Sequence, residues 1–147
     1  MTKDSNSMKL NYDVDSNDFT RAGEASSNIK KILKQLGVAS KVIRKVSIAT
    51  YEAEMNIAIH SYGGKINVEI TPKEVQIVVK DNGPGIKDVN LAMKEGYSTA
   101  TERIRELGFG AGMGLPNIKR CADVFELKSE EGKGTKVFIK IFLNKNT

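Results

Sequence analysis

Residues 65–85 read KINVEITPKEVQIVVKDNGPG, and this stretch decides the fold. Apolar and polar residues alternate from Lys65 to Thr71 and again from Glu74 to Lys80, which is the period of a β-strand with one buried face. A Thr-Pro-Lys turn joins the two runs. The sequence therefore predicts a β-hairpin that ends in a polar, glycine-rich turn at residues 81–85.

Two helices are expected before this hairpin. Apolar residues at helical spacing predict a first helix that is capped by Asp18 or Thr20 and ends at Gly37. The second helix is expected over residues 40–60, where a Gly-Gly pair follows and stops it. Both apolar stripes are expected to face a sheet.

The rest of the chain adds strands, a helix and a long loop. Residues 95–114 are polar and glycine-rich over about twenty positions, whereas the usual connection is about five, and such loops are typically functional lids or disordered segments. The order of elements predicts an α+β fold, a two-layer α/β sandwich with helices on one face of a mixed, mostly antiparallel sheet. Further strands are expected at 9–14, 124–129 and 135–143, and a helix at about 115–123.

The length of 147 residues suits a single domain, expected at 9–147 after a disordered tail at 1–8. No apolar run is long enough to cross a bilayer and the start is polar, so a cytoplasmic protein is expected. The one cysteine, Cys121, has no partner for a disulfide and is expected to be a buried structural thiol.

The chain is moderately basic. The formal net charge is +5, but the lysines and arginines are spread along the chain, which is typical of solvated helix faces rather than of a nucleic-acid footprint. Nucleic acid and membrane are therefore not expected as partners. An acidic protein partner or the phosphates of a nucleotide would account for the same excess.

The sequence contains neither a P-loop nor a dinucleotide-binding glycine pattern. Four separated segments resemble, in order, the N box, the two glycine boxes and the final glycine-threonine element of the Bergerat-fold ATPases, a superfamily that includes gyrase B and the histidine kinases. These segments are Glu52-Ala-Glu-Met-Asn56, Asp81-Asn-Gly-Pro-Gly85, Gly108-Phe-Gly-Ala-Gly-Met-Gly114 and Gly132-Lys-Gly-Thr135.

Within this superfamily the chain is most similar to the anti-sigma regulatory serine/threonine kinases of the RsbT-like type. Two segments carry the likeness, Glu95-Gly-Tyr-Ser-Thr-Ala and Gly112-Met-Gly-Leu-Pro-Asn. The resemblance implies a histidine kinase-like ATP-binding domain that uses ATP, ADP and Mg²⁺. It also implies transfer of the γ-phosphate to a serine or threonine of a STAS-domain partner of the anti-anti-sigma type. A sigma factor and a second copy of the chain stay open as further partners.

The N-box residues have chemistry that fits such a kinase. Glu52 and Asn56 are four apart on the expected helix and so project from one face. An amide oxygen suits Mg²⁺, which makes Asn56 the candidate metal ligand. Glu52, one turn away, is the candidate catalytic base that orients or deprotonates a hydroxyl or water. A solvated glutamate beside a capping asparagine is the structural alternative.

The remaining candidates bind the nucleotide. Asp81 can accept a hydrogen bond from the adenine amino group, as the resemblance implies, and glycines beside it let the backbone approach a flat ring. Thr135 matches the threonine that the family places near adenine. Glycines ahead of a helix start expose amide donors for phosphate oxygens, although a turn or hinge would use the same residues. The glycines concerned are Gly83, Gly85, Gly108, Gly110, Gly112 and Gly114.

Three side chains and two other functions stay open. His60 is read as a packing residue, and whether Arg103 and Arg105 in the lid take part is undecided. The chain could instead be a non-catalytic, ATP-gated module that sequesters a partner, or the ATP-binding half of a histidine kinase system. Glu52 favours transfer, because nucleotide binding alone needs no base.

Overall fold

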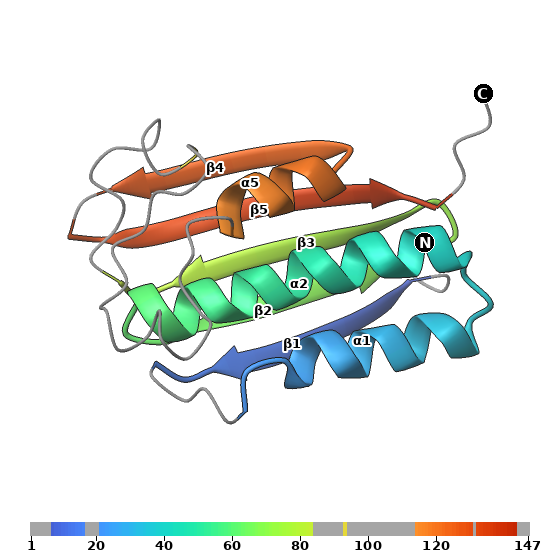
Figure 1. Ribbon diagram of the computed structural model, residues 1–147, viewed down its shortest axis with the longest axis horizontal. Coiled ribbons are helices and arrows are strands. Elements are labelled where there is room, and N and C mark those ends of the chain that lie inside the picture. Colours follow the sequence, from blue (N-terminus) through green and yellow to red (C-terminus); the bar gives the residue numbers. More distant parts are fainter. Residues whose placement is uncertain (1–6, 17–20, 84–92, 94–113, 131, 144–147) are drawn as a thin grey trace.

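The protein is described by a computed structural model over residues 7–16, 21–83, 93, 114–130 and 132–143. Five strands form one sheet in the order β1-β2-β3-β5-β4, and every pairing among them is antiparallel. In the described part of the chain, three helices cover one face of this sheet (Figure 1). The predicted α+β two-layer fold is confirmed. The elements are β1 Met8–Val14, α1 Glu24–Gln35, α2 Ser40–His60, β2 Gly64–Ile70, β3 Glu74–Asp81, α5 Gly114–Cys121, β4 Val124–Glu130 and β5 Gly134–Phe142.

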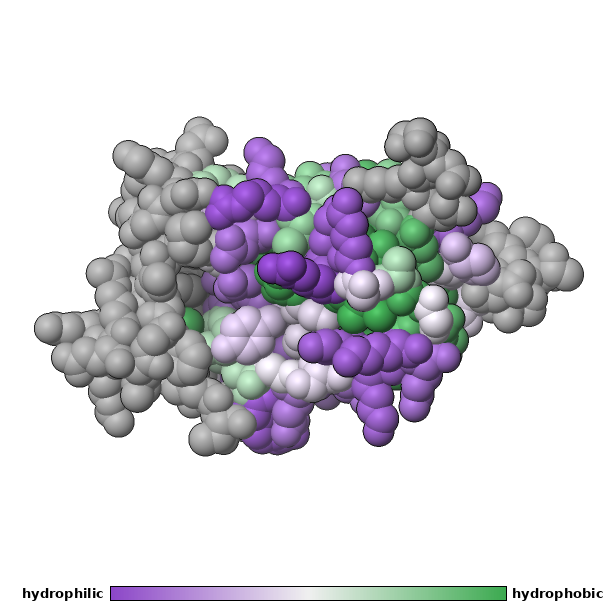
Figure 2. Space-filling view, turned by 45° about the vertical axis from the view of Figure 1, so that its right-hand side comes forward, coloured by the Kyte–Doolittle hydropathy of each residue, from purple (hydrophilic) through white to green (hydrophobic). Residues whose placement is uncertain are grey.

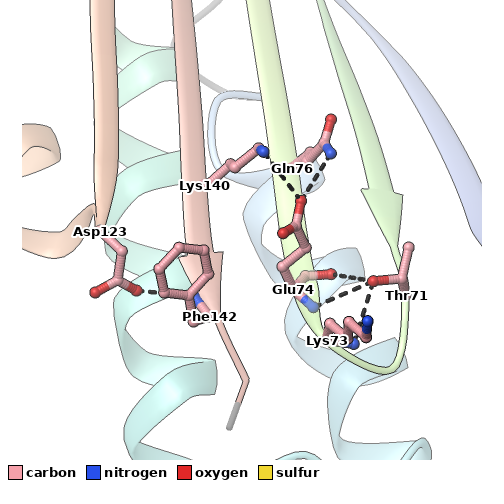
Figure 3. A network of polar contacts seen from close by, with 7 residues as sticks. All are labelled: Thr71, Lys73, Glu74, Gln76, Asp123, Lys140 and Phe142. Atoms are coloured by element: carbon pink, nitrogen blue, oxygen red, sulfur yellow. Dashed lines mark hydrogen bonds and ion pairs between the residues drawn. The ribbon is translucent and has the colours of Figure 1, made fainter. Parts of the chain in front are cut away.

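The predicted hairpin is the pair β2 and β3, with Ile70 opposite Val75 next to the turn. In the turn, the Thr71 hydroxyl oxygen accepts hydrogen bonds from the backbone N–H groups of Lys73 and Glu74, each at 3.2 Å (Figure 3). A threonine hydroxyl that bonds its own turn fixes the register of the two strands. The apolar residues of the alternating pattern in β2 and β3 therefore lie on the face of the sheet that the helices cover.

The core lies between the sheet and the helix layer. Alternate residues of β2, β3 and β5 are almost fully buried against apolar positions of α1, α2 and α5. Burial of one such side chain is worth roughly 1.5–3 kcal/mol, so this layer stabilises most of the fold. The side chains buried to 2% exposure or less include Ile29, Leu33, Val46, Ile57, Ile66, Val68, Val75, Ile77, Ile118, Ile139 and Ile141.

The start of α1 differs from the prediction. The helix begins at Glu24, while Asp18 and Thr20 lie outside the described residues. The first N–H groups of the helix donate hydrogen bonds to the carboxylate of Glu54, a residue of α2 that is only 2% exposed. A carboxylate at a helix N-terminus satisfies free donors and the helix dipole together. The donors are the N–H groups of Gly23 at 2.9 Å, Ala25 at 3.1 Å and Ser26 at 2.8 Å.

Replacing Glu54 with glutamine is expected to lower the free energy of unfolding by about 2 kcal/mol, because an amide NH₂ would face buried backbone donors that need an acceptor. Chemical denaturation followed by circular dichroism measures the change. Glu24→Gln is the matched control, since its carboxylate is 65% exposed and its ion pair with Arg21 lies on the surface. Equal stability of the two variants would contradict a capping role.

The same variant has an expected pH dependence. Burial raises the pKa of Glu54 above its ordinary value, and the three backbone donors oppose this only in part. The folded state then keeps the proton to higher pH than the unfolded state does. The contribution of Glu54 is therefore full below the unfolded pKa and declines as the pH rises through the folded pKa. The stability deficit of Glu54→Gln should be largest below the unfolded pKa and narrow as the pH rises through the folded pKa.

The surface combines many charged residues with a few apolar side chains. Figure 2 shows hydrophilic residues around exposed hydrophobic ones on one side of the molecule. The large apolar side chains that remain exposed are Met8, Leu36, Ile48, Tyr51, Tyr62 and Phe142. Among the helices of the described residues, none combines the length and apolar character that crossing a membrane requires.

Candidate nucleotide-binding site

Asp81 is held at the end of β3 by two backbone groups from different parts of the chain. Its Oδ1 atom accepts hydrogen bonds from the N–H of Gly83 and from the N–H of Thr135, both at 3.0 Å. Thr135 is 54 residues further along the chain. Both hydrogen bonds that the described residues make to this carboxylate therefore end on Oδ1.

The backbone around Asp81 is packed too closely for larger side chains. A Cβ atom at Gly83 would come within 2.8 Å of the Ser61 Cβ, and one at Gly134 would clash with the Asp81 carbonyl oxygen. Gly134 also has φ 106°, in the region that favours glycine. The Thr135 and Ser129 hydroxyls are 2.8 Å apart, which ties β5 to β4 beside the carboxylate. These contacts fix the position of Asp81.

Glu52 contacts α5 across the helix layer. The Asn117 Nδ2 atom donates a hydrogen bond to Glu52 Oε2 at 2.9 Å, and Arg120 Nη2 donates to Asn117 Oδ1, also at 2.9 Å. Both Glu52 and Asn117 are only partly exposed. The carboxylate is therefore oriented by an amide rather than solvated alone. Sequence reasoning did not assign Asn117, although it stands one helical turn after Gly114 in a segment that carried the family resemblance.

Asn56 lies against the first turn of α5. A Cβ atom at Gly114 would stand 3.0 Å from the Asn56 Oδ1 atom. The amide oxygen thus lies beside the end of α5 where backbone N–H groups are free. Among the described residues, no group of three or more His, Cys, Asp and Glu side chains is arranged to hold a metal. An ion bound here would depend mainly on phosphate and water oxygens, as Mg²⁺ commonly does.

The candidate residues follow α2 in one direction. Ser61, just past the end of α2, packs beside Gly83, while Asn56 and Glu52 lie about one and a half and two and a half turns earlier. With a rise of about 1.5 Å per residue, Ser61 and Glu52 are on the order of 13 Å apart along the helix. Asp81 therefore lies near the C-terminal end of α2, and Asn56 and Glu52 follow within the same half of the helix.

Several predicted positions are not described. Four of the predicted glycines and both arginines lie outside the described residues. They are Gly85, Gly108, Gly110, Gly112, Arg103 and Arg105. Cys121 is half-buried against the core and burial raises the pKa of its thiol, which agrees with a structural role. An open hollow of about 630 Å³ lies elsewhere, between the start of α1 and Tyr51, and no candidate residue lines it.

The chain is similar to proteins of known family. Residues 41–145 match the family model described as histidine kinase-, DNA gyrase B- and HSP90-like ATPase. The serine/threonine-protein kinase RsbT of Bacillus subtilis is 32% identical over 112 residues, which cover 74% of this chain and 78% of that protein. The anti-sigma F factor of Clostridium kluyveri is 30% identical over 146 residues, which cover 95% of this chain and 96% of the relative.

A solved structure shares the fold. The crystal structure of the RsbU and RsbW domains from Mycobacterium tuberculosis superposes with a TM-score of 0.62 at 13% identity. The match covers 95% of this chain and 34% of that longer chain. Together with the family model, which spans most of the sequence, these likenesses show that the chain belongs to the family of histidine kinase-, DNA gyrase B- and HSP90-like ATPases.

Proposed function

We propose that this chain is an ATP-dependent protein serine/threonine kinase of the anti-sigma regulatory type. The names of its relatives support this, one being a serine/threonine-protein kinase and others anti-sigma F factors. The observation that carries the proposal is the position of the Glu52 carboxylate. An amide of α5 holds this carboxylate in place on α2, at a distance from Asp81. A module that only bound ATP would not need a positioned carboxylate there.

The nucleotide end of the site is built for adenine. The Asp81 Oδ2 atom accepts from the exocyclic amino group, while Oδ1 keeps its two backbone bonds. Guanine carries a carbonyl oxygen at the same position and would face the carboxylate with an acceptor. The N–H groups of Gly83 and Thr135 bond to Asp81 Oδ1, so both residues would lie beside the ring. The site therefore favours ATP over GTP.

The phosphate end uses the first turn of α5. Gly114 begins this helix and would offer its backbone N–H group to the phosphate oxygens, which the helix dipole also attracts. Gly108, Gly110 and Gly112, which lie outside the described residues, are proposed as further donors. Mg²⁺ would be held by the Asn56 amide oxygen and would offset the negative charge of the phosphates. The contact of Asn56 with Gly114 supports this placement.

Transfer then takes place beside Glu52. The hydroxyl oxygen of a partner serine or threonine bonds to the γ-phosphorus, the bond from that phosphorus to the β–γ bridging oxygen breaks, and ADP leaves. Glu52 accepts the hydroxyl proton, and Asn117 keeps the carboxylate oriented toward it. The partner that fits the proposed family is a STAS-domain protein of the anti-anti-sigma type. A sigma factor would be a second partner that is bound rather than phosphorylated.

Incubation with γ-labelled ATP, Mg²⁺ and the STAS-domain proteins encoded nearby is expected to label a serine or threonine of one of them. Phosphopeptide mass spectrometry identifies the residue, and labelling should stop when EDTA removes the metal. Phosphate on a histidine would instead favour the histidine kinase alternative. Tight ATP-dependent binding of a partner with no label would favour the sequestering module and overturn the kinase proposal.

A further inference from the structure

The open face of the sheet carries an ordered pattern of side chains. In the described part of the chain, all three helices lie on the opposite face (Figure 1). Because side chains alternate along a strand, residues next to buried ones point to this open face. Lys80 points there while its neighbour Asp81 points to the helix side, and Lys136 and Thr135 divide in the same way. The open face is thus separate from the candidate nucleotide site.

Four lysines form one straight row across this face, which we call the lysine row. The strand register places Lys65 opposite Lys80, Lys80 opposite Lys136, and Lys136 opposite Lys128. All four are exposed. The row therefore crosses β2, β3, β5 and β4 without interruption.

Such a row is unfavourable for the isolated domain. Like charges directly opposite each other on neighbouring strands repel and destabilise a sheet. Lys65 at one end is 3.9 Å from Asp13 of β1. Within the described residues, Lys80, Lys128 and Lys136 have no carboxylate within ion-pair distance. Carboxylates from another molecule would remove this repulsion.

The rows beside the lysines are different in character. The next row pairs Val78 with Phe138, and both are only partly buried. In the row beyond, the Lys140 Nζ atom is 3.6 Å from a Glu74 carboxylate oxygen, which also accepts from Gln76 at 2.7 Å (Figure 3). The Lys140 charge is thus neutralised within the protein, whereas those of Lys80, Lys128 and Lys136 have no such ion pair among the described residues. A cationic row therefore lies beside an apolar pair, which Asn67 and Glu126 flank on the neighbouring strands. The Lys140 Nζ atom stands 5.8 Å from the centre of the Phe138 ring.

We propose that the lysine row and the Val78–Phe138 pair form a docking surface for an acidic, partly apolar segment of a partner protein. Carboxylates of the partner would lie along the lysines, and its apolar side chains would lie over Phe138. The contact would combine charge complementarity with burial of apolar surface. Nucleic acid fits less well, because a phosphate chain would gain nothing from the apolar Val78–Phe138 pair beside the lysines. The proposal does not depend on kinase activity.

The test uses the full chain without nucleotide and a fluorescein-labelled peptide of alternating glutamate and leucine. Fluorescence anisotropy at low salt should show binding that weakens as salt is added. The double variant Lys80→Gln/Lys136→Gln should bind this peptide roughly tenfold more weakly, since two charge pairs are lost. The matched control is Lys30→Gln/Lys34→Gln, which removes two exposed charges from α1 and should change binding less than about twofold.

Three outcomes would overturn the proposal. One is no binding by the wild-type chain, and another is an equal loss in both double variants, which would indicate general charge attraction. The third is tighter binding of a DNA oligonucleotide that the lysine-row variant abolishes, which would make the face a nucleic-acid surface. Thermal unfolding checks the fold of both variants, and Lys80→Gln/Lys136→Gln should be no less stable than the control because repulsion is relieved.

Discussion

Replacing Glu52 with glutamine is expected to lower the rate of phosphoryl transfer by roughly two to four orders of magnitude while ATP affinity changes little. Glutamine keeps the size of the side chain and an oxygen that can accept from Asn117 Nδ2. It cannot take a proton from the attacking hydroxyl. Binding and chemistry should therefore separate, with calorimetry giving the affinity and single-turnover labelling the rate.

Two further variants make this result specific. Glu24→Gln removes an exposed carboxylate of α1 and should leave both ATP affinity and transfer unchanged. Asn56→Ala removes the proposed metal ligand and should weaken Mg-ATP binding as well as transfer. If Glu52→Gln transfers phosphate at the normal rate, the base assignment is wrong. If it no longer binds ATP, the carboxylate has a structural role instead.

Asp81→Asn is expected to weaken ATP binding by roughly a hundredfold, since a buried hydrogen bond to a charged group is worth about 1.5–3 kcal/mol and here becomes a clash of two donors. The asparagine oxygen can still accept from the N–H groups of Gly83 and Thr135, so the fold should be kept. Its NH₂ group would then stand where Oδ2 meets the adenine amino group. Calorimetry with ATP and GTP measures the loss and the change in selectivity.

The matched control is Asp13→Asn, an exposed carboxylate on edge strand β1, which should not change nucleotide affinity. Thermal unfolding of Asp81→Asn separates a lost ligand contact from a damaged turn. An unchanged ATP affinity in Asp81→Asn, or equal affinity of the wild-type chain for ATP and GTP, would remove this carboxylate from the adenine site.

The sequence predicted those elements whose signals are local. The boundaries of α2 were predicted because apolar residues at helical spacing lie between Ser40 and a terminating Gly-Gly pair. The β2–β3 hairpin was predicted because strict alternation surrounds a short turn. In both cases neighbouring residues are enough to decide the local conformation.

Contacts between distant segments could not be predicted in this way. Glu54 caps α1 from another helix, so a search for an N-cap near residue 20 could not find it. The bond from Asn117 to Glu52 joins residues 65 apart. The family resemblance pointed to both Asp81 and Thr135. Only the strand order explains why these two residues meet, since β5 lies beside β3. The lysine row likewise requires the register of four strands.

The position of β5 has a consequence for the synthesis of this protein. β5 is made after β3 and β4, yet it lies between them in the sheet. Until it leaves the ribosome, the apolar edge of β3 has no partner and β4 has nothing to pair with. The sheet therefore stays incomplete until β5 has been made, and it exposes a strand edge of the kind that chaperones shield. A chain that stopped within β5 would lose part of an inner strand and leave β3 and β4 unjoined.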